Sequence, residues 1–228
     1  MSNIGIKTEV FKKISYFCRA NASNFLRKVH TAFYLYAKTQ RRKSFLFLCV
    51  FPSLRTNGKN RIQMIQQITK QDDFVVLTKL LNEAFGTVAN EFGLTKENTP
   101  TNSAFITSEE LKAQLTENRE FYTYINDGKN IGFVAIEKSL SAPDTFYIEK
   151  LSVTPGHRHL GIGRQLMNFA SNRIAENGGK RISIGLINSH TVLKKWYEKQ
   201  GYVECSIKVF EHLPFDVCIM EKESTTII

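Results

Sequence analysis

The sequence predicts an α/β domain in which a mixed sheet of about seven strands carries helices on both faces. Two observations lead to this prediction. Asn126-Asp-Gly, a strong hairpin signal, separates two short apolar runs near the middle of the chain. On either side of it, further short apolar runs alternate with longer segments whose apolar residues recur at helical spacing. Strands therefore surround two groups of helices, as in a sheet that is covered on both sides.

The elements up to the hairpin are a strand, two helices and the hairpin itself. Residues 62–69 are compatible with a first strand. Residues 72–92 are predicted to form an amphipathic helix, because apolar side chains recur at helical spacing: Phe74, Val75, Leu77, Leu80, Leu81, Ala84 and Phe85. Acidic residues follow Ser108 in the way typical of the first turn of a helix. The two hairpin strands are predicted at 121–125 and 131–137.

A turn, a strand and a helix are predicted after the hairpin. The turn at 141–144 leads into the strand at 145–153. The helix follows a glycine-bearing segment and ends at Gly178-Gly179; its apolar residues are Ile162, Leu166, Phe169, Ala170 and Ile174.

The chain is predicted to close with a strand, a helix and a pair of strands. The strand at 181–187 is short and apolar. Asn188-Ser189 is expected to cap the next helix, and Gly201 to stop it; the apolar stripe of this helix is Val192, Leu193, Trp196 and Tyr197. The closing strands are predicted at 203–210 and 215–220.

The segment from residue 153 to residue 164 (VTPGHRHLGIGR) joins a predicted strand to a predicted helix through a basic turn that contains glycine. The first N–H groups of a helix lack partners and lie at the positive end of its dipole, so an anion placed there gains several donors. Gly161 and Gly163 have no Cβ that would hold a ligand away from the main chain. The segment is therefore a predicted phosphate site.

Two common phosphate loops do not fit this segment. A dinucleotide-binding fold needs a third glycine where Leu166 stands, and the next predicted strand, 181–187, has no acidic residue for a ribose. A P-loop needs Gly-Lys followed by Ser or Thr, and the chain has no such triplet.

The segment resembles the Arg/Gln-x-x-Gly-x-Gly/Ala signature of the Gcn5-related N-acetyltransferases (the GNAT family), which Arg158, Gly161 and Gly163 match. A Val-x-Pro precedes the arginine, as is customary in that family. Residues 188–202 resemble its second signature, an Asn, then an aromatic pair that ends in Tyr, then Gly-Tyr. The resemblance covers about residues 64–222. It implies a GNAT-type, mostly antiparallel sheet and the pyrophosphate of acetyl-CoA as the ligand.

The resemblance also implies which residues contact acetyl-CoA, the co-substrate: Leu151, Ser152, Val153, Arg158, His159, Leu160, Gly161, Ile162, Gly163, Arg164 and Asn188. Main-chain groups of residues 151–153 would hold the acetyl carbonyl and the pantetheine amides. Leu160 stands where many members carry Lys or Arg, so Arg158 and Arg164 are expected to supply the positive charge. Asn188 would contact CoA, cap the following helix, or do both.

The implied reaction moves an acetyl group from a thioester to a primary amine by direct transfer in a ternary complex. The amine must first lose a proton, because the ammonium form, with a pKa of about 10, has no lone pair. Glu149 is the candidate base, acting through water; a structural acid paired with Lys150 is the alternative interpretation. Tyr197 occupies the family position that faces the CoA sulfur and is the candidate general acid; a core tyrosine is the alternative.

The acceptor is expected to be a small-molecule or peptide amine, and the sequence does not identify it. In the family it is gripped by the first helices and the loop between them, here about 84–107, and by the closing hairpin around 211–215. The charged residues of these segments, compatible with a cationic amine, are Glu91, Glu97, His212 and Asp216. Two other functions stay open: a CoA-binding module without catalysis, and an adaptor that binds nucleic acid or membrane through a basic N-terminal arm.

The net charge of +10 belongs to an N-terminal extension that matches no part of the family pattern. Residues 1–63 hold 13 Lys and Arg against the single acid Glu9, a net charge of +12, whereas the remainder holds 18 bases and 20 acids. We therefore predict an extension at 1–63 and a GNAT domain at 64–228. The nearly neutral domain gives no reason to expect nucleic acid as its partner.

Three interpretations of the extension stay open. It is an over-extended reading frame with the true start at Met64, a targeting peptide, or a basic arm that touches nucleic acid or lipid near the apolar run 45–51. A run of seven apolar residues cannot span a bilayer, which needs about 20, so no transmembrane helix is expected. The four cysteines and five histidines have no metal-binding spacing. A reduced, cytoplasmic protein without a metal is the simplest account, and a homodimer is left open.

Overall fold

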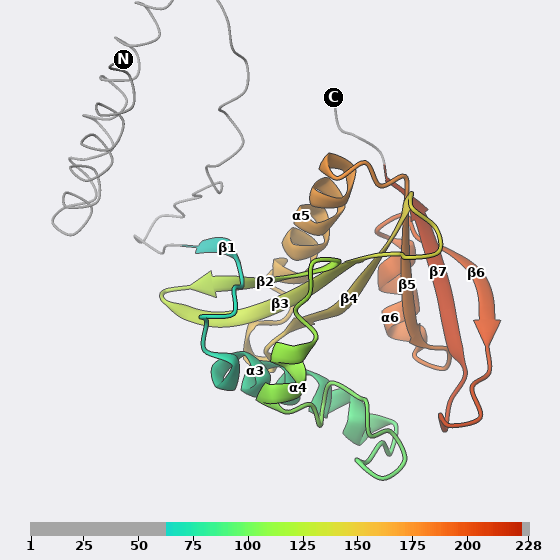
Figure 1. Ribbon diagram of the computed structural model, residues 1–228. Coiled ribbons are helices and arrows are strands. Elements are labelled where there is room, and N and C mark those ends of the chain that lie inside the picture. Colours follow the sequence, from blue (N-terminus) through green and yellow to red (C-terminus); the bar gives the residue numbers. More distant parts are fainter. Residues whose placement is uncertain (1–62, 225–228) are drawn as a thin grey trace, which may run out of the picture. The chain divides into compact units, whose positions relative to one another are not determined.

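The computed structural model describes residues 63–224, which form one seven-stranded sheet and its helices (Figure 1). The predicted extension at 1–63 lies almost entirely outside these residues. In chain order the elements are β1 (Gln63–Gln67), α3 (Phe74–Glu91), α4 (Ser108–Ala113), β2 (Arg119–Asn126), β3 (Lys129–Lys138), β4 (Thr145–Val153), the 3₁₀ turn η1 (Pro155–His157), α5 (Ile162–Glu176), β5 (Arg181–Ile187), α6 (Thr191–Glu198), β6 (Val203–Lys208) and β7 (Val217–Glu223).

The sheet is mostly antiparallel, with the strand order β1-β2-β3-β4-β5-β7-β6. Only β4 and β5 run parallel among these neighbours. The central hairpin has the two-residue turn that its sequence predicts: Asp127 and Gly128 both have positive φ, 50° and 76°, as a type I′ turn requires. The predicted mixed sheet of about seven strands is confirmed.

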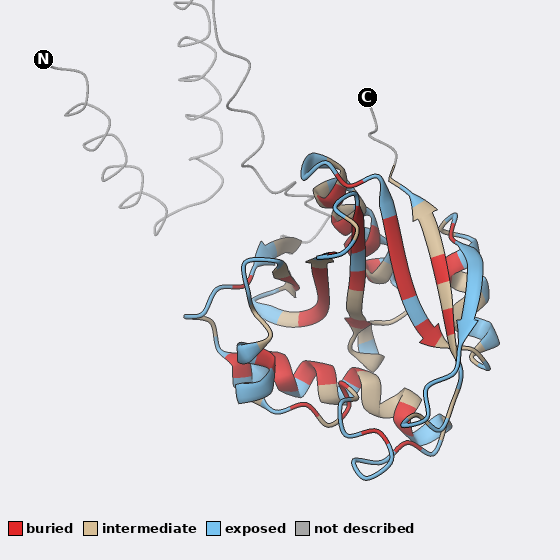
Figure 2. Ribbon diagram, turned by 45° about the vertical axis from the view of Figure 1, so that its right-hand side comes forward, coloured by how far each residue is buried: buried red, intermediate tan, exposed pale blue. Residues whose placement is uncertain are grey.

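Helices cover both faces of the sheet, as predicted. We call the face under α3 and α4 the outer face; its core joins Phe74, Leu77, Leu81 and Leu111 to the sheet residues Phe121, Phe133 and Ala135. We call the face under α5 and α6 the inner face; its core joins Leu166, Ala170, Ile174 and Tyr197 to Ile148, Ile182, Ile184, Leu186 and Met220. Figure 2 shows buried residues along the central strands and α5, and exposed residues along β6.

Side-chain caps begin the two outer helices. The Asp73 carboxylate accepts from the first-turn amides of α3, and Thr107 and Glu110 form a reciprocal capping box on α4. The cap predicted for α6 is wrong. Its N-cap is His190, which gives no side-chain cap bond, and Asn188 lies two residues too early to reach the free amides.

The strands β4 and β5 pair at their beginnings and then part (Figure 1). Their last aligned residues are Tyr147 and Ser183, yet β4 continues to Val153 and β5 to Ile187. Over this second half, the main-chain groups of β4 and β5 that face each other therefore do not form hydrogen bonds with one another. We call the space where they diverge the strand gap.

Most of the predicted element limits agree with the structure. The strands predicted at 145–153 and 181–187 have the same limits as β4 and β5. The closing strands differ: β6 stops at Lys208 and β7 runs from Val217 to Glu223. The reason is register, because Val217 pairs with the last residue of β5 and Glu223 with its first. None of the helices in residues 63–224 is long and apolar enough to cross a membrane.

Candidate active site

The predicted phosphate segment forms a tight turn that leaves the start of α5 open. His159 and Gly161 both have positive φ, 62° and 79°. Gly161 is the N-cap of α5 and has no side chain with which to cap it. The amides of the first turn therefore keep their donors for a ligand, and the helix dipole adds positive potential there.

Arg158 is held against α3. Its Nη2 donates to the main-chain oxygen of Ala84 at 2.8 Å and to Thr87 Oγ1 at 3.0 Å, and its Nε donates to the Val153 oxygen at 3.2 Å. The guanidinium thus ties the loop to the outer helix. Part of the charge expected for phosphate is engaged in this contact, so its role toward CoA stays a prediction. Arg164 is exposed in the first turn of α5.

The other predicted loop residues lie around the same turn. His159, Leu160 and Gly161 are exposed, and Ile162 is buried in the inner core. Gly163 faces α6: a Cβ built on it would lie 3.7 Å from the Trp196 ring and 3.9 Å from Val153 Cγ2. The structure therefore brings the phosphate turn, the end of β4 and the aromatic residues of α6 together.

A β-bulge interrupts β4 beside the strand gap. Glu149 is opposite Ala135 and Ser152 is opposite Phe133, so one extra residue lies between these pairs. Lys150 has a φ of 50° at the bulge. Leu151 and Val153 pack against the inner core, whereas Ser152 is buried and its hydroxyl makes no hydrogen bond among the described residues. The bulge re-aims the main chain at 151–153, where the predicted pantetheine contacts lie.

Tyr197 lies on the inner side of the gap. It is 8% exposed and packs edge-on against Trp196 and Tyr202, at ring distances of 4.9 and 5.7 Å. Burial raises the pKa of its phenol above the ordinary value. Within the described part of the chain, its hydroxyl has no hydrogen-bond partner. A buried phenol that is protonated and unpaired can donate to a ligand.

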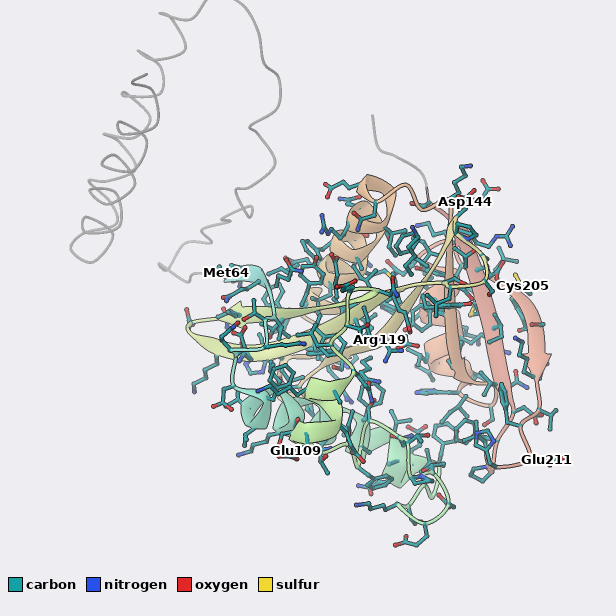
Figure 3. All side chains as sticks on the ribbon, in the orientation of Figure 1. Met64, Glu109, Arg119, Asp144, Cys205 and Glu211 are labelled. Atoms are coloured by element: carbon teal, nitrogen blue, oxygen red, sulfur yellow. The ribbon has the colours of Figure 1, made fainter. Side chains whose placement is uncertain are left out.

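Glu149 lies on the outer side of the gap, because it shares a face with Ala135. Its Oε2 is 3.1 Å from Arg119 Nη2, and the side chain is 35% exposed. Arg119, which is labelled in Figure 3, also binds Glu137, through Nε at 3.1 Å. The ion-pair partner of Glu149 is thus Arg119 and not Lys150, whose pKa is lowered chiefly by burial.

Asn188 follows β5 and belongs to a polar bridge. Its Oδ1 accepts from Lys194 Nζ at 2.8 Å, and the same ammonium is 2.9 Å from Glu204 Oε2. Its N–H donates to the Asp216 oxygen. The side-chain amide nitrogen of Asn188 has no partner of its own among these bonds, and its contact with CoA stays a prediction.

The segments implied to grip the acceptor meet in a third, smaller core. The end of α3 and the loop after it contribute Ala89, Leu94 and Ala104, and these pack with Ile187 of β5 and Phe215 of the β6–β7 connection. The charged residues singled out in these segments are all exposed: Glu91, Glu97, His212 and Asp216. Within residues 63–224, no group of three or more His, Cys, Asp or Glu side chains could hold a metal ion.

Sequence reasoning missed Arg119 and Glu137. In a regular two-residue hairpin, Arg119 would lie opposite Ile136. Glu137 would then point to the other face of the sheet, where Arg119 could not reach it. A register shift between Tyr124 and Ile125 instead brings it opposite Glu137. No residue in that stretch signals the shift, so the charged pair could not be found from the hairpin pattern alone.

A sequence model of the acetyltransferase (GNAT) domain matches residues 88–223, which is more than half of the chain. The chain is 31% identical over 91 residues to a streptothricin acetyltransferase of Streptomyces lavendulae, covering 40% of this chain and 48% of that protein. It is 24% identical over 99 residues to a probable N-acetyltransferase camello of Xenopus tropicalis, covering 43% and 45%. The chain thus matches about half the length of these relatives.

Solved structures share the fold at low identity. The ribosomal-protein-S18-alanine N-acetyltransferase of Escherichia coli superposes with a TM-score of 0.56 at 16% identity, over 72% of this chain and 95% of that one. An aminoglycoside 6'-N-acetyltransferase, solved with coenzyme A, gives a TM-score of 0.53 at 18% identity, over 71% and 97%. Together with the match of the domain model, the parted strands β4 and β5 and the uncapped glycine turn before α5 show that this chain belongs to the GNAT acetyltransferase family.

Proposed function

We propose that the protein is an acetyl-CoA-dependent N-acetyltransferase that acts on a primary amine. The observation that carries this proposal is the open start of α5, where a left-handed Gly161 leaves the first amides uncapped beside the strand gap. A structural neighbour solved with coenzyme A supports the donor. The donor's pyrophosphate would bind the turn, and its pantetheine would run along the main chain at 151–153, on the side where β5 has parted from β4.

The two candidate catalytic residues lie on opposite faces of the sheet at the gap. Tyr197 belongs to the inner core, and Glu149 shares the outer face with Ala135. In this arrangement the thioester reaches the gap from the side of α5 and α6, and the amine approaches from the outer side. Such a geometry favours direct transfer in a ternary complex, because both substrates are held at once and no protein nucleophile is needed.

Glu149 is proposed as the base, acting through a water molecule. The amine nitrogen loses its proton to this relay, attacks the thioester carbon and gains the acetyl group, while the C–S bond breaks. At 35% exposure the carboxylate can reach water. Its contact with Arg119 holds the side chain in place, which favours a fixed relay over a mobile one.

Tyr197 is proposed to donate a hydrogen bond to the leaving sulfur. Burial raises the phenol pKa above its ordinary value of about 10, whereas a cysteine-like thiol has a pKa of about 8.5. The phenol therefore keeps its proton more firmly than the thiol does. The hydrogen bond stabilises the thiolate as it departs. The nitrogen of the new amide gives up its second proton to water, and the thiolate takes a proton from water to leave as the CoA thiol.

The test is a thiol-release assay with acetyl-CoA, the full chain and a panel of amines. The panel holds streptothricin, an aminoglycoside and a peptide with an N-terminal alanine, because similar proteins carry these acceptors in their names. We expect release of free CoA, matched by N-acetylated product, with at least one amine. CoA binding without turnover on any amine would instead identify a catalytically silent CoA-binding module.

A further inference from the structure

Gly185 is an unusual residue for its place in the sheet. It lies in the middle of β5, which has β7 on one side and the start of β4 on the other. Its neighbours Ile184 and Leu186 point into the inner core, so Gly185 faces outward. The residue is exposed, although β5 is an interior strand. A glycine in a strand interior weakens the strand, because it adds no side-chain packing and loses more backbone entropy on folding.

The ordinary structural reasons for such a glycine are missing. Gly185 is not among the described residues with positive φ. The pairing of β5 with β7 runs without a register shift through this position, so no bulge requires it. A Cβ built on Gly185 would lie 3.4 Å from Val217 Cγ1 and 3.7 Å from Ile219 Cδ1, which are tolerable contacts. The folded protein could therefore hold alanine here, and the close approach of a ligand is the explanation that remains.

The position of Gly185 agrees with that explanation. Tyr147 and Ser183 are the last aligned residues of β4 and β5. Two residues further along each strand, where the strands part, Glu149 and Gly185 occupy corresponding positions on the outer face. The bare main chain of Gly185 thus lies on β5, across the gap from the strand that carries the candidate base. Val217 and Ile219, both half-buried, stand next to it on β7.

We propose that Gly185 is a specificity-determining residue for the amine acceptor, an inference that rests on the proposed acetyltransferase function. The carbon that carries the reactive nitrogen lies over Gly185, between Glu149 and the apolar side chains of Val217 and Ile219. A carboxylate on one side and aliphatic groups on the other suit an alkylamine. The space left by the absent Cβ of Gly185 is the size of one methyl group, so it holds the acceptor carbon but no branch on that carbon. The preferred acceptor therefore has an unbranched carbon next to the nitrogen.

The test compares Gly185→Ala with wild type on two acceptors that differ by one methyl group, an n-alkylamine and its α-methyl analogue. We expect kcat/KM for the n-alkylamine to fall at least tenfold, because the new methyl group occupies the space that this acceptor uses. The KM for acetyl-CoA should change less than twofold, and the melting temperature should stay at or above that of wild type, since alanine is better than glycine in a strand. Lower acceptor use in a protein of equal or higher stability separates a specificity role from a structural one.

The converse variant keeps the inference testable if Gly185→Ala folds poorly. Ile219→Val shortens the facing side chain, so the ratio of kcat/KM for the α-methyl amine to that for the n-alkylamine should rise at least threefold. The inference is overturned if Gly185→Ala leaves acceptor kinetics unchanged, or if it raises the KM for acetyl-CoA instead. Wild-type protein without turnover on any amine would refute the proposed function itself, so the two failures are distinct.

Discussion

The substitution Glu149→Gln separates the chemistry proposed for this carboxylate from its structural contact. Glutamine keeps the shape of the side chain but cannot accept a proton from the amine. Removal of a positioned general base lowers rates by about 100-fold to 10,000-fold. We therefore expect kcat with the best acceptor to fall by at least about 100-fold, measured as thiol release at saturating acetyl-CoA.

The structural contribution of the same carboxylate is small. Glu149 and Arg119 are 3.1 Å apart, with 35% and 19% of their side chains exposed. In a water-like dielectric, two charges at that distance attract by about 1 kcal/mol, and measured partly exposed ion pairs contribute about 0 to 1 kcal/mol. The free energy of unfolding in urea should thus fall by no more than about 1 kcal/mol, which is too little to remove activity at 25 °C.

Glu137→Gln is the matched control for this substitution. Glu137 binds the same Arg119 on the same face, one strand further from the gap. Glu137→Gln removes a comparable ion pair but keeps the candidate base. The kcat of this variant should therefore stay within about threefold of wild type, because only a surface contact is lost. Equal rates for the two variants would refute the reasoning, because both carboxylates would then be structural.

Three further substitutions test other parts of the account. Tyr197→Phe should lower kcat by about 100-fold. Tyr202, a buried neighbour whose hydroxyl contacts Met167 Sδ, is the control, and Tyr202→Phe should leave kcat unchanged. Because burial raises the Tyr197 pKa, the kcat of wild type should show no alkaline decline up to about pH 10. Gly179→Ala should destabilise the fold by about 1–3 kcal/mol in urea unfolding, since a Cβ there would lie 2.4 Å from Ile174 Cγ2; an unchanged midpoint would contradict that packing. Lys150→Met should stabilise the fold at pH 7, because burial lowers the pKa of Lys150 and so disfavours its charged form in the folded protein. Between the folded and the unfolded pKa of Lys150 the unfolded chain binds more protons, so the free energy of unfolding of wild type should rise with pH there. The same rise in Lys150→Met would contradict this explanation.

Local sequence patterns were sufficient to predict most of the fold. Asn126-Asp-Gly specifies a two-residue turn with positive φ, and the structure has it at Asp127 and Gly128. The strands β4 and β5 have their predicted limits, because each is a short apolar run with clear turn or helix signals at its ends. The order of the strands was not predicted, since pairing between distant segments leaves no mark on local spacing.

The sequence predicted the main residues of the candidate site but not the ion pairs around them. Gly161 and Tyr197 were predicted from motifs, and Glu149 from its place as a carboxylate in an apolar run. Arg119 and Glu137 depend on a register shift in β2, and the position of Lys150 depends on a bulge in β4. The cap assigned to Asn188 is wrong because Asn188 lies two residues before the N-cap of α6, His190, and its oxygen accepts from Lys194 instead. The register shift and the bulge arise from tertiary structure, which overrides local propensity.

Titration of the protein with CoA and with pantetheine, which lacks the pyrophosphate, tests the central assignment most directly. If the turn before α5 holds the pyrophosphate, CoA should bind wild-type protein at least about tenfold more tightly than pantetheine, since two or more charge-assisted hydrogen bonds contribute over 1.4 kcal/mol. In Gly161→Ala, a side chain at φ 79° strains the turn, and CoA should lose most of this advantage while pantetheine binding is unchanged. Equal affinity of wild type for CoA and pantetheine would contradict the account.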